Sequence, residues 1–199
     1  THPQPSPRGV HQTKRSLQLI SHLGCDSIVL NEKEFNFKNK GAIVFHAGGN
    51  DSRRAWPENK WIKLAEILSK NHQIAIVKTP ETAILIQRMK EREFNVEIFD
   101  GDLVKFKNWV RNQKMLIGND SMPGHLAAYL GIPAISIFGS QDPKMTCPIG
   151  QWITIIKPDK SCEHKRNHWR LCQKCMGTID VERVSGAVTN LLSRAQAGE

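Results

Sequence analysis

The chain has 199 residues, of which 39% are hydrophobic, which is enough for one well-buried domain but short for two full Rossmann-like halves. No run of about 18 apolar residues is present, and the N-terminus lacks the apolar core of a signal peptide, so we expect a cytoplasmic protein without a membrane span. A net charge of +9 favours anionic partners, which include nucleic acid, an anionic membrane surface and a phosphorylated substrate.

The first 40 residues differ in pattern from the rest of the chain. Residues 1–9 are rich in proline and polar residues and predict an arm. Residues 10–24 have apolar side chains at helical spacing and end at a glycine, a pattern typical of an amphipathic helix, and the charged residues 31–40 indicate a linker. We therefore expect an arm, a helix and a linker over 1–40, and the main domain over 41–199.

From residue 41 onward, short apolar runs alternate with segments of helical spacing. The predicted strands cover 42–46, 73–78, 95–99, 114–118, 134–138 and 152–156, and the predicted helices begin at Pro57 or cover about 80–92, 103–111, 123–130 and 181–192. This alternation through short loops predicts an α/β fold with a doubly wound, Rossmann-like parallel sheet. Such sheets bind ligands at the carboxyl ends of their strands.

The loop after the first predicted strand is the first candidate site. Gly48 and Gly49 allow close approach of a ligand to the backbone, and the polar residues Asn50 and Ser52 precede Arg54, whose guanidinium suits phosphate oxygens. Neither the dinucleotide fingerprint nor the P-loop pattern occurs in the chain. A tight turn with solvated arginines is the alternative interpretation.

The loop after the second predicted strand contains Glu81. This carboxylate can accept hydrogen bonds from a ribose or a base, or it can simply stabilise the first turn of the following helix. The glycine-containing turn over 138–143 lies at the same sheet edge, where it is either a ligand contact or a helix-free turn.

The junction of strand 114–118 and helix 123–130 contains Asp120, Ser121, Met122 and His125. A strand that runs into a helix aims backbone N–H groups and the positive end of the helix dipole at one point, which suits a phosphate. Two structural alternatives stand beside this prediction: Asp120 caps the helix, or His125 is a buried, hydrogen-bonded helix residue.

Taken in order, these segments resemble the C-terminal domain of the ADP-heptose:lipopolysaccharide heptosyltransferase family, glycosyltransferase family 9. The resemblance rests on the glycine-rich loop that runs into Arg-Ala-Trp-Pro at 54–57, on Asn-Asp-Ser at 119–121 with His-Leu-Ala-Ala at 125–128, and on Phe-Gly-Ser-Gln-Asp-Pro at 138–143. It implies the GT-B fold and a nucleotide-sugar donor bound by this domain.

The resemblance also implies residue roles. The 48–52 loop and Arg54 would contact the diphosphate, Glu81 the nucleoside, and Asp120 the donor sugar or ribose. His125 and the amides around Ser121 and Met122 would contact the phosphates. The family usually has glycine where this chain has Met122, which implies either compensation by the glycine at 124 or a different donor.

The family's acceptor-binding half and its acidic general base find no counterpart in these residues, so we expect donor binding without transfer by this chain. The implied enzyme transfers a sugar to a lipopolysaccharide-type or other glycan acceptor, with no metal required and with peripheral contact to an anionic inner membrane. A partner chain or an N-terminal domain would supply the missing half.

Cysteine and histidine residues gather in the segment 162–175. Cys162, Cys172 and Cys175, together with His164 or His168, offer ligands for a tetrahedral zinc ion, although thiols or a disulfide explain them as well.

Three other functions remain open at this point: a catalytically silent nucleotide-binding domain, a nucleotide-sugar epimerase-like protein, and a nucleic-acid-binding module built on the basic segment 162–170. The favoured interpretation has no nucleic-acid partner.

Overall fold

The computed structural model describes residues 10–14, 16, 41–49, 51–160, 162–163 and 172–197. The predicted arm over 1–9 and the predicted linker over 31–40 lie outside these residues. Residues 12–14 and 16 are helical, in agreement with the start of the helix predicted over 10–24. The ring Nε2 of His11 lies 3.0 Å from the carbonyl oxygen of Cys147, so this segment contacts the main domain.

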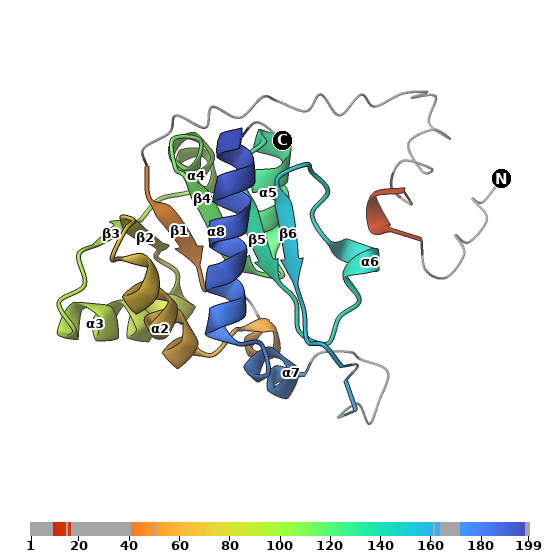
Figure 1. The fold of residues 1–199 in the computed structure, drawn as a ribbon, viewed down its shortest axis with the longest axis horizontal. Coiled ribbons are helices and arrows are strands. Elements are labelled where there is room, and N and C mark those ends of the chain that lie inside the picture. The colour runs from red at the N-terminus through yellow and green to blue at the C-terminus, as the bar shows by residue number, and fades with distance from the viewer. Residues whose placement is uncertain are drawn as a thin grey trace.

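The described residues form a sheet of six parallel strands in the order β3-β2-β1-β4-β5-β6 (Figure 1). The strands are β1 (Ile43–His46), β2 (Ile74–Val77), β3 (Val96–Phe99), β4 (Met115–Asn119), β5 (Ala134–Ile137) and β6 (Ile153–Ile156). All six agree with the predicted strands to within one or two residues at each end, and the doubly wound prediction is confirmed. The strand order reverses between β1 and β4, so the topological switch point lies there.

Helices cover both faces of the sheet (Figure 1). One face carries α2 (Glu58–Leu68), α3 (Ala83–Glu91) and α8 (Val181–Ala197), with α2 packed against both of the others. The opposite face carries α4 (Leu103–Val110) and α5 (Met122–Leu130). Shorter elements are the 3-10 turns η1 (Ser52–Arg54) and η2 (Pro80–Thr82), and the helices α6 (Pro143–Thr146) and α7 (Gln173–Gly177).

The period of two along the strands divides the core between these two layers. In β1, Ile43 and Phe45 face the layer of α2, α3 and α8, whereas Val44 faces α4 and α5. All three side chains are fully buried. The four central strands β1, β2, β4 and β5 are buried on both faces and are mostly apolar, which is typical of parallel sheets, whereas the edge strands β3 and β6 are only partly buried.

Three features differ from the sequence-based expectation. Helix α6 follows the turn over 138–143, where Asp142 caps it by accepting a hydrogen bond from the backbone N–H of Lys144. Helix α7 occupies part of the cysteine-rich segment, and α8 continues to residue 197 rather than ending near 192. Helices of four or five residues are too short to produce a detectable 3.6-residue period, which explains why α6 and α7 were not predicted. No helix in the described part of the chain is long and apolar enough to cross a membrane.

Candidate functional site

The loops that follow β1 and β4 meet at the switch point, and Asn119 joins them. Its side-chain Oδ1 accepts a hydrogen bond from the backbone N–H of Trp56 at 3.0 Å, and its Nδ2 donates to the carbonyl of Ala47 at 2.8 Å. The residue is 1% exposed, so these bonds are shielded from water. The first and fourth loops, both predicted as ligand-binding segments, are therefore held together as one unit.

Arg54 and Asp120 face each other across this junction. Arg54 Nη1 lies 3.8 Å from Asp120 Oδ2, which is an ion-pair distance but too long for a hydrogen bond. The arginine side chain is 39% exposed, whereas that of Asp120 is 8% exposed. Neither Arg54 Nε nor Asp120 Oδ2 has a hydrogen-bond partner in the described structure, although both atoms are buried. The pair therefore retains unused hydrogen-bonding capacity on both sides.

Burial raises the pKa of the Asp120 carboxyl, and the neighbouring Arg54 guanidinium opposes this shift only in part. The backbone N–H of Asp120 donates to the carbonyl of Ile137, which fixes the residue at the end of β4. Ser121 rather than Asp120 is the N-cap residue of α5, and no side chain caps this helix. The helix-capping alternative for Asp120 is therefore wrong.

Asp120→Asn is expected to raise the free energy of unfolding by about 1 kcal/mol at pH 7, because it removes the charge from a buried carboxylate whose Oδ2 has no hydrogen-bond partner in the described structure. The folded-state pKa is raised, so the charged carboxylate weakens the fold progressively as the pH rises above the ordinary carboxyl range. The advantage of the variant should therefore shrink between pH 7 and pH 4 in urea denaturation. A variant less stable than the parent at pH 7 would instead assign the carboxylate a structural role.

The two glycines of the first loop lie in different surroundings. A Cβ atom on Gly48 would approach Thr79 Oγ1 to 2.4 Å, so this glycine allows the first and second loops to pack closely. A Cβ atom on Gly49 would meet nothing within 4 Å. Open space therefore lies over Gly49, which is in the same loop as Arg54, whereas Gly48 serves internal packing. Ser52 is exposed in η1, and Asn50 lies outside the described residues.

Glu81 lies in η2 at the end of β2, where it is exposed. A hydrogen bond from the Thr79 side chain, together with the residue's own backbone N–H and the nearby His46, lowers the pKa of Glu81. This carboxylate is therefore ionised at neutral pH. Burial lowers the pKa of His46, which ends β1, so its imidazole is neutral at pH 7.

The N-terminal turn of α5 points its amides toward the same sheet edge. Ser121 donates its hydroxyl to the carbonyl of Asn119 and leaves the helix amides uncapped. Met122 is 50% exposed, and Gly124 is buried with its Cα facing Pro148 and the Ser136 hydroxyl. Gly124 therefore serves packing inside the domain rather than close approach at the position of Met122.

His125 is exposed on α5, so the structural alternative of a fully buried helix histidine is wrong. Desolvation of its ring, followed by the effect of nearby His11, lowers the pKa of His125, while the backbone of Thr146 opposes the shift. This histidine is accessible to a ligand and mostly neutral at pH 7.

A hollow of about 690 Å³ lies beside the second loop, between α3 and the ends of β2 and β3. Lys78 and Asp100, which form an ion pair, both line it. The other lining residues are Thr79, Pro80, Ala83, Ile86, Gln87, Lys90 and Ile98.

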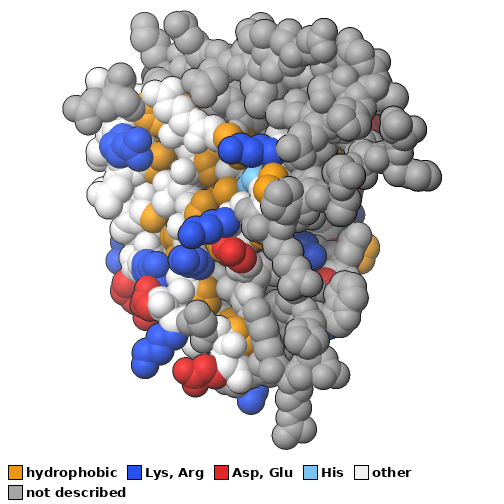
Figure 2. All heavy atoms as spheres, turned by 90° about the vertical axis from the view of Figure 1, so that its right-hand side faces the viewer, with side chains coloured by type: hydrophobic (Ala, Val, Ile, Leu, Met, Phe, Trp, Pro, Cys, Tyr) orange, Lys and Arg blue, Asp and Glu red, His pale blue; other side chains and the backbone are white. Residues whose placement is uncertain are grey.

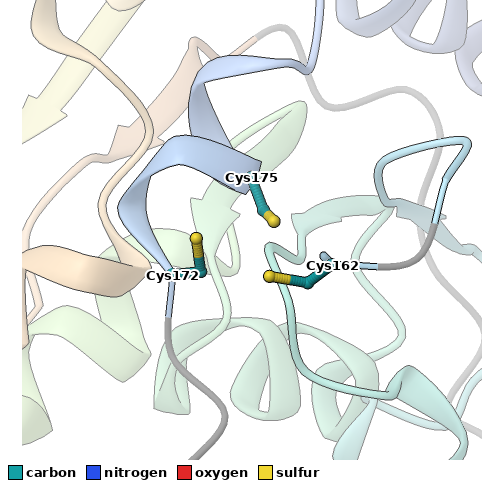
Figure 3. Close-up of side chains that lie close together, drawn as sticks. All are labelled: Cys162, Cys172 and Cys175. Carbon is teal, nitrogen blue, oxygen red and sulfur yellow. The ribbon is translucent and has the colours of Figure 1, made fainter. Parts of the chain in front are cut away.

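The cysteine-rich segment forms a second cluster. The Sγ atoms of Cys162, Cys172 and Cys175 all lie within 4.8 Å of one another (Figure 3). Burial and then the other two thiols raise the pKa of Cys175 to about 12. Burial also acts to raise the pKa of Cys172, but N–H groups of α7 and the neighbouring thiols lower it overall. His164 and His168, the other predicted ligands, lie outside the described residues.

The sequence assigned no structural role to three residues that shape the site, although two of them lie in the segments that carry the family resemblance. Asn119 is the link between the loops, Trp56 donates its indole N–H to the carbonyl of Ile179, and Lys60 donates to the carbonyls of Gly177 and Ile179. These bonds join the first loop to the segment that leads into α8. The hydrogen-bonded residues lie 63 to 123 positions apart in the chain, so these contacts cannot be predicted from a local sequence pattern.

The charge of the surface is mixed. On the face shown in Figure 2, the described Lys and Arg side chains are interspersed with Asp and Glu and with uncharged residues. Although the net charge of the chain is +9, the described side chains on this face do not form a purely basic patch.

The strand order and the paired loops at the switch point define a Rossmann-like α/β domain, the architecture found in each half of a GT-B glycosyltransferase. The model of glycosyltransferase family 9 (heptosyltransferase) matches residues 9–175. The chain therefore belongs to glycosyltransferase family 9.

Individual relatives agree with this assignment. Lipopolysaccharide heptosyltransferase 1 from Campylobacter coli is 26% identical over 179 residues, which cover 82% of this chain and 50% of the relative. A glycosyltransferase family 9 structure from Veillonella parvula has a TM-score of 0.74 at 17% identity. The match covers 96% of this chain and 63% of the Veillonella parvula chain. The E. coli heptosyltransferase WaaC with ADP has a TM-score of 0.64 at 15% identity, and this match covers 94% of this chain and 52% of the WaaC chain. The chain thus spans about half the length of the curated relative.

Proposed function

We propose that this chain is the nucleotide-sugar donor-binding part of a heptosyltransferase-like enzyme, with an ADP-heptose as the donor. The observation that carries the proposal is the junction of Arg54 and Asp120 at the switch point, where buried polar atoms on both side chains have no described hydrogen-bond partner. A bound ligand with both donors and acceptors would satisfy them. The choice of donor follows from the relatives, one of which is described with ADP.

The diphosphate is proposed to lie over Gly49, between Arg54 and the N-terminal turn of α5. Open space above Gly49 leaves room for it, and the uncapped helix amides supply donors. Arg54 contributes a positive charge that can fork onto two phosphate oxygens. Ser121, Met122 and His125 lie at or next to this turn, so their backbone or side chains are proposed as further phosphate contacts.

The nucleoside and the sugar are proposed to occupy opposite sides of the diphosphate. Glu81 is ionised and exposed at the second loop, so its carboxylate can accept ribose hydroxyl hydrogen bonds. The hollow beside Thr79 has the size expected of a small-ligand pocket and would receive the base. Asp120, at the end of β4, would accept hydrogen bonds from hydroxyls of the donor.

We propose a lipopolysaccharide-type glycan as the acceptor and an inverting sugar transfer as the reaction. The general base is proposed to lie in an N-terminal domain or a partner chain, so this chain alone would bind the donor without transferring it. Metal is not needed for this binding mode, because Arg54 and the helix amides offset the diphosphate charge. The basic net charge of the chain would favour cytoplasmic work at the surface of an anionic inner membrane.

Ligand titrations test the proposal. ADP and an ADP-heptose are expected to raise the melting temperature of this chain with increasing concentration, whereas GDP- and UDP-sugars should have smaller effects. A transfer assay with a lipopolysaccharide acceptor should show no turnover by this chain alone. The same assay mixture without acceptor should leave the donor sugar unchanged.

Three results would contradict it. No stabilisation by any nucleotide-sugar, repeated at low salt, would exclude donor binding. Conversion of the donor sugar without acceptor would indicate an epimerase, and salt-dependent binding of unspecific oligonucleotides without a nucleotide response would favour the nucleic-acid module. Full turnover by this chain would refute the assignment of the general base to residues elsewhere.

A further inference from the structure

We infer that Cys162, Cys172 and Cys175 form a thiolate metal site, which binds Zn²⁺ or iron at α7, the helix that packs against η1 of the first loop. Cys172 and Cys175 belong to the start and body of α7, whereas Cys162 follows β6, and their three side chains point toward a common centre (Figure 3). The Sγ atoms lie within 4.8 Å of one another. Tetrahedral coordination with Zn–S bonds of about 2.3 Å places sulfur atoms about 3.8 Å apart, so only a small contraction is required.

The number and spacing of the thiols distinguish this site from a disulfide. A disulfide joins two sulfurs and would leave the third thiol beside it, and no disulfide links the described cysteines. The Cys-x-x-Cys pair at 172–175 is the spacing of a zinc knuckle. Thiolates select Zn²⁺ and iron over the hard cations Mg²⁺ and Ca²⁺.

The local backbone also suits a metal. Cys172 is the N-cap residue of α7, and the backbone N–H of Cys175 donates to its carbonyl oxygen at 3.2 Å. This turn holds the two cysteines of the Cys-x-x-Cys pair at adjacent positions on one helix start. Helix α7 has five residues, too few to be stable by itself, so an external tether is needed to hold it. A metal ion that joins α7 to the end of β6 would supply that tether.

The site is connected to the rest of the domain through α7. Met176, between the thiols and α8, is fully buried, and a Cβ atom on Gly139 would lie 2.8 Å from its sulfur. The carbonyl of Gly177, the last residue of α7, accepts a hydrogen bond from Lys60. Loss of the metal should therefore lower the stability of the domain, with the donor loop affected only indirectly.

Metal analysis of the purified chain tests this inference. With tags removed and no chelator used, we expect about one equivalent of zinc plus iron per chain. Cys172→Ser and Cys175→Ser should each reduce this content at least tenfold and lower the melting temperature. Cys147→Ser is the matched control, because Cys147 lies at the end of α6 and outside the cluster, and this variant should retain the metal.

A second measurement guards against variants that do not fold. After metal removal under reducing conditions, Co²⁺ added to the unmodified chain should give the thiolate charge-transfer and intense visible bands of a tetrahedral site. A chain that binds neither Zn²⁺, iron nor Co²⁺ would overturn the inference, as would a disulfide among the three cysteines in freshly prepared protein. Equal metal content in Cys172→Ser and Cys147→Ser would overturn it too. None of these readouts depends on donor binding.

Discussion

Replacing Arg54 with alanine is expected to weaken the binding of ADP to this chain by roughly 10- to 100-fold, the equivalent of losing one charge-assisted hydrogen bond. The guanidinium faces the buried carboxylate of Asp120 at 3.8 Å and has a buried Nε without a described partner, so it is positioned to bind an anion. Isothermal titration calorimetry on the folded variant measures the change. Its melting temperature without ligand should fall at pH 7, because the buried Asp120 carboxylate loses its neighbouring positive charge.

Arg53→Ala is the matched control, because it removes the same charge from the neighbouring residue. The Arg53 side chain is 54% exposed and already bound to Asp51 at 2.7 Å. That contact, together with the backbone N–H of Arg53, lowers the pKa of Asp51 to about 2. ADP affinity should change by less than about threefold in this variant, since exposed ion pairs contribute little. Equal losses in both variants would mean that overall charge, rather than the Arg54 position, attracts the nucleotide.

Asn119→Ala is expected to lower the free energy of unfolding by about 2–4 kcal/mol, because it leaves one buried and one half-buried backbone group without a partner. These groups are the N–H of Trp56 and the carbonyl of Ala47, which Asn119 joins across the switch point. Trp56 is 2% exposed, so water has little access to its freed N–H. Urea denaturation of the variant and the parent measures the difference.

Asn112→Ala provides the comparison for this result. Asn112 is exposed after α4, and its side-chain amide makes a 3.5 Å contact with the carbonyl of Asn108. Surface substitutions of this type usually change stability by less than about 0.5 kcal/mol. An Asn119→Ala variant within 1 kcal/mol of the parent would show that the two loops are held together by other contacts.

The sheet was predictable because its four central strands are buried on both faces. Runs such as Ile43–Phe45 are apolar without interruption, and the turns between them contain glycine, proline or polar residues. The carboxyl edge then follows from topology alone, since every strand is parallel to its neighbours. For this reason Glu81, Arg54 and Asp120 were correctly expected at one edge of the sheet.

The contacts within that edge could not be read from the sequence. Gly48 suggested close approach of a ligand, but the space beside it is filled by Thr79 from the second loop. The hydrogen bonds by which Asn119 joins the two loops depend on the register of β1 with β4, where His46 pairs with Gly118. The convergence of the three cysteines likewise depends on where α7 packs. Each of these facts requires the fold rather than the local pattern.

The hydrogen bonds from Trp56 and Lys60 to the segment before α8 indicate that a shortened form of this domain must retain α8. The family match ends at residue 175, but Val184, Val188 and Leu191 of α8 are all buried in the larger core cluster. A gene fragment designed on the family boundary would delete this helix and expose the apolar side of the sheet to water. The buried core of this domain therefore extends 20 residues beyond the end of the family match at residue 175, to Ala195, which is 2% exposed.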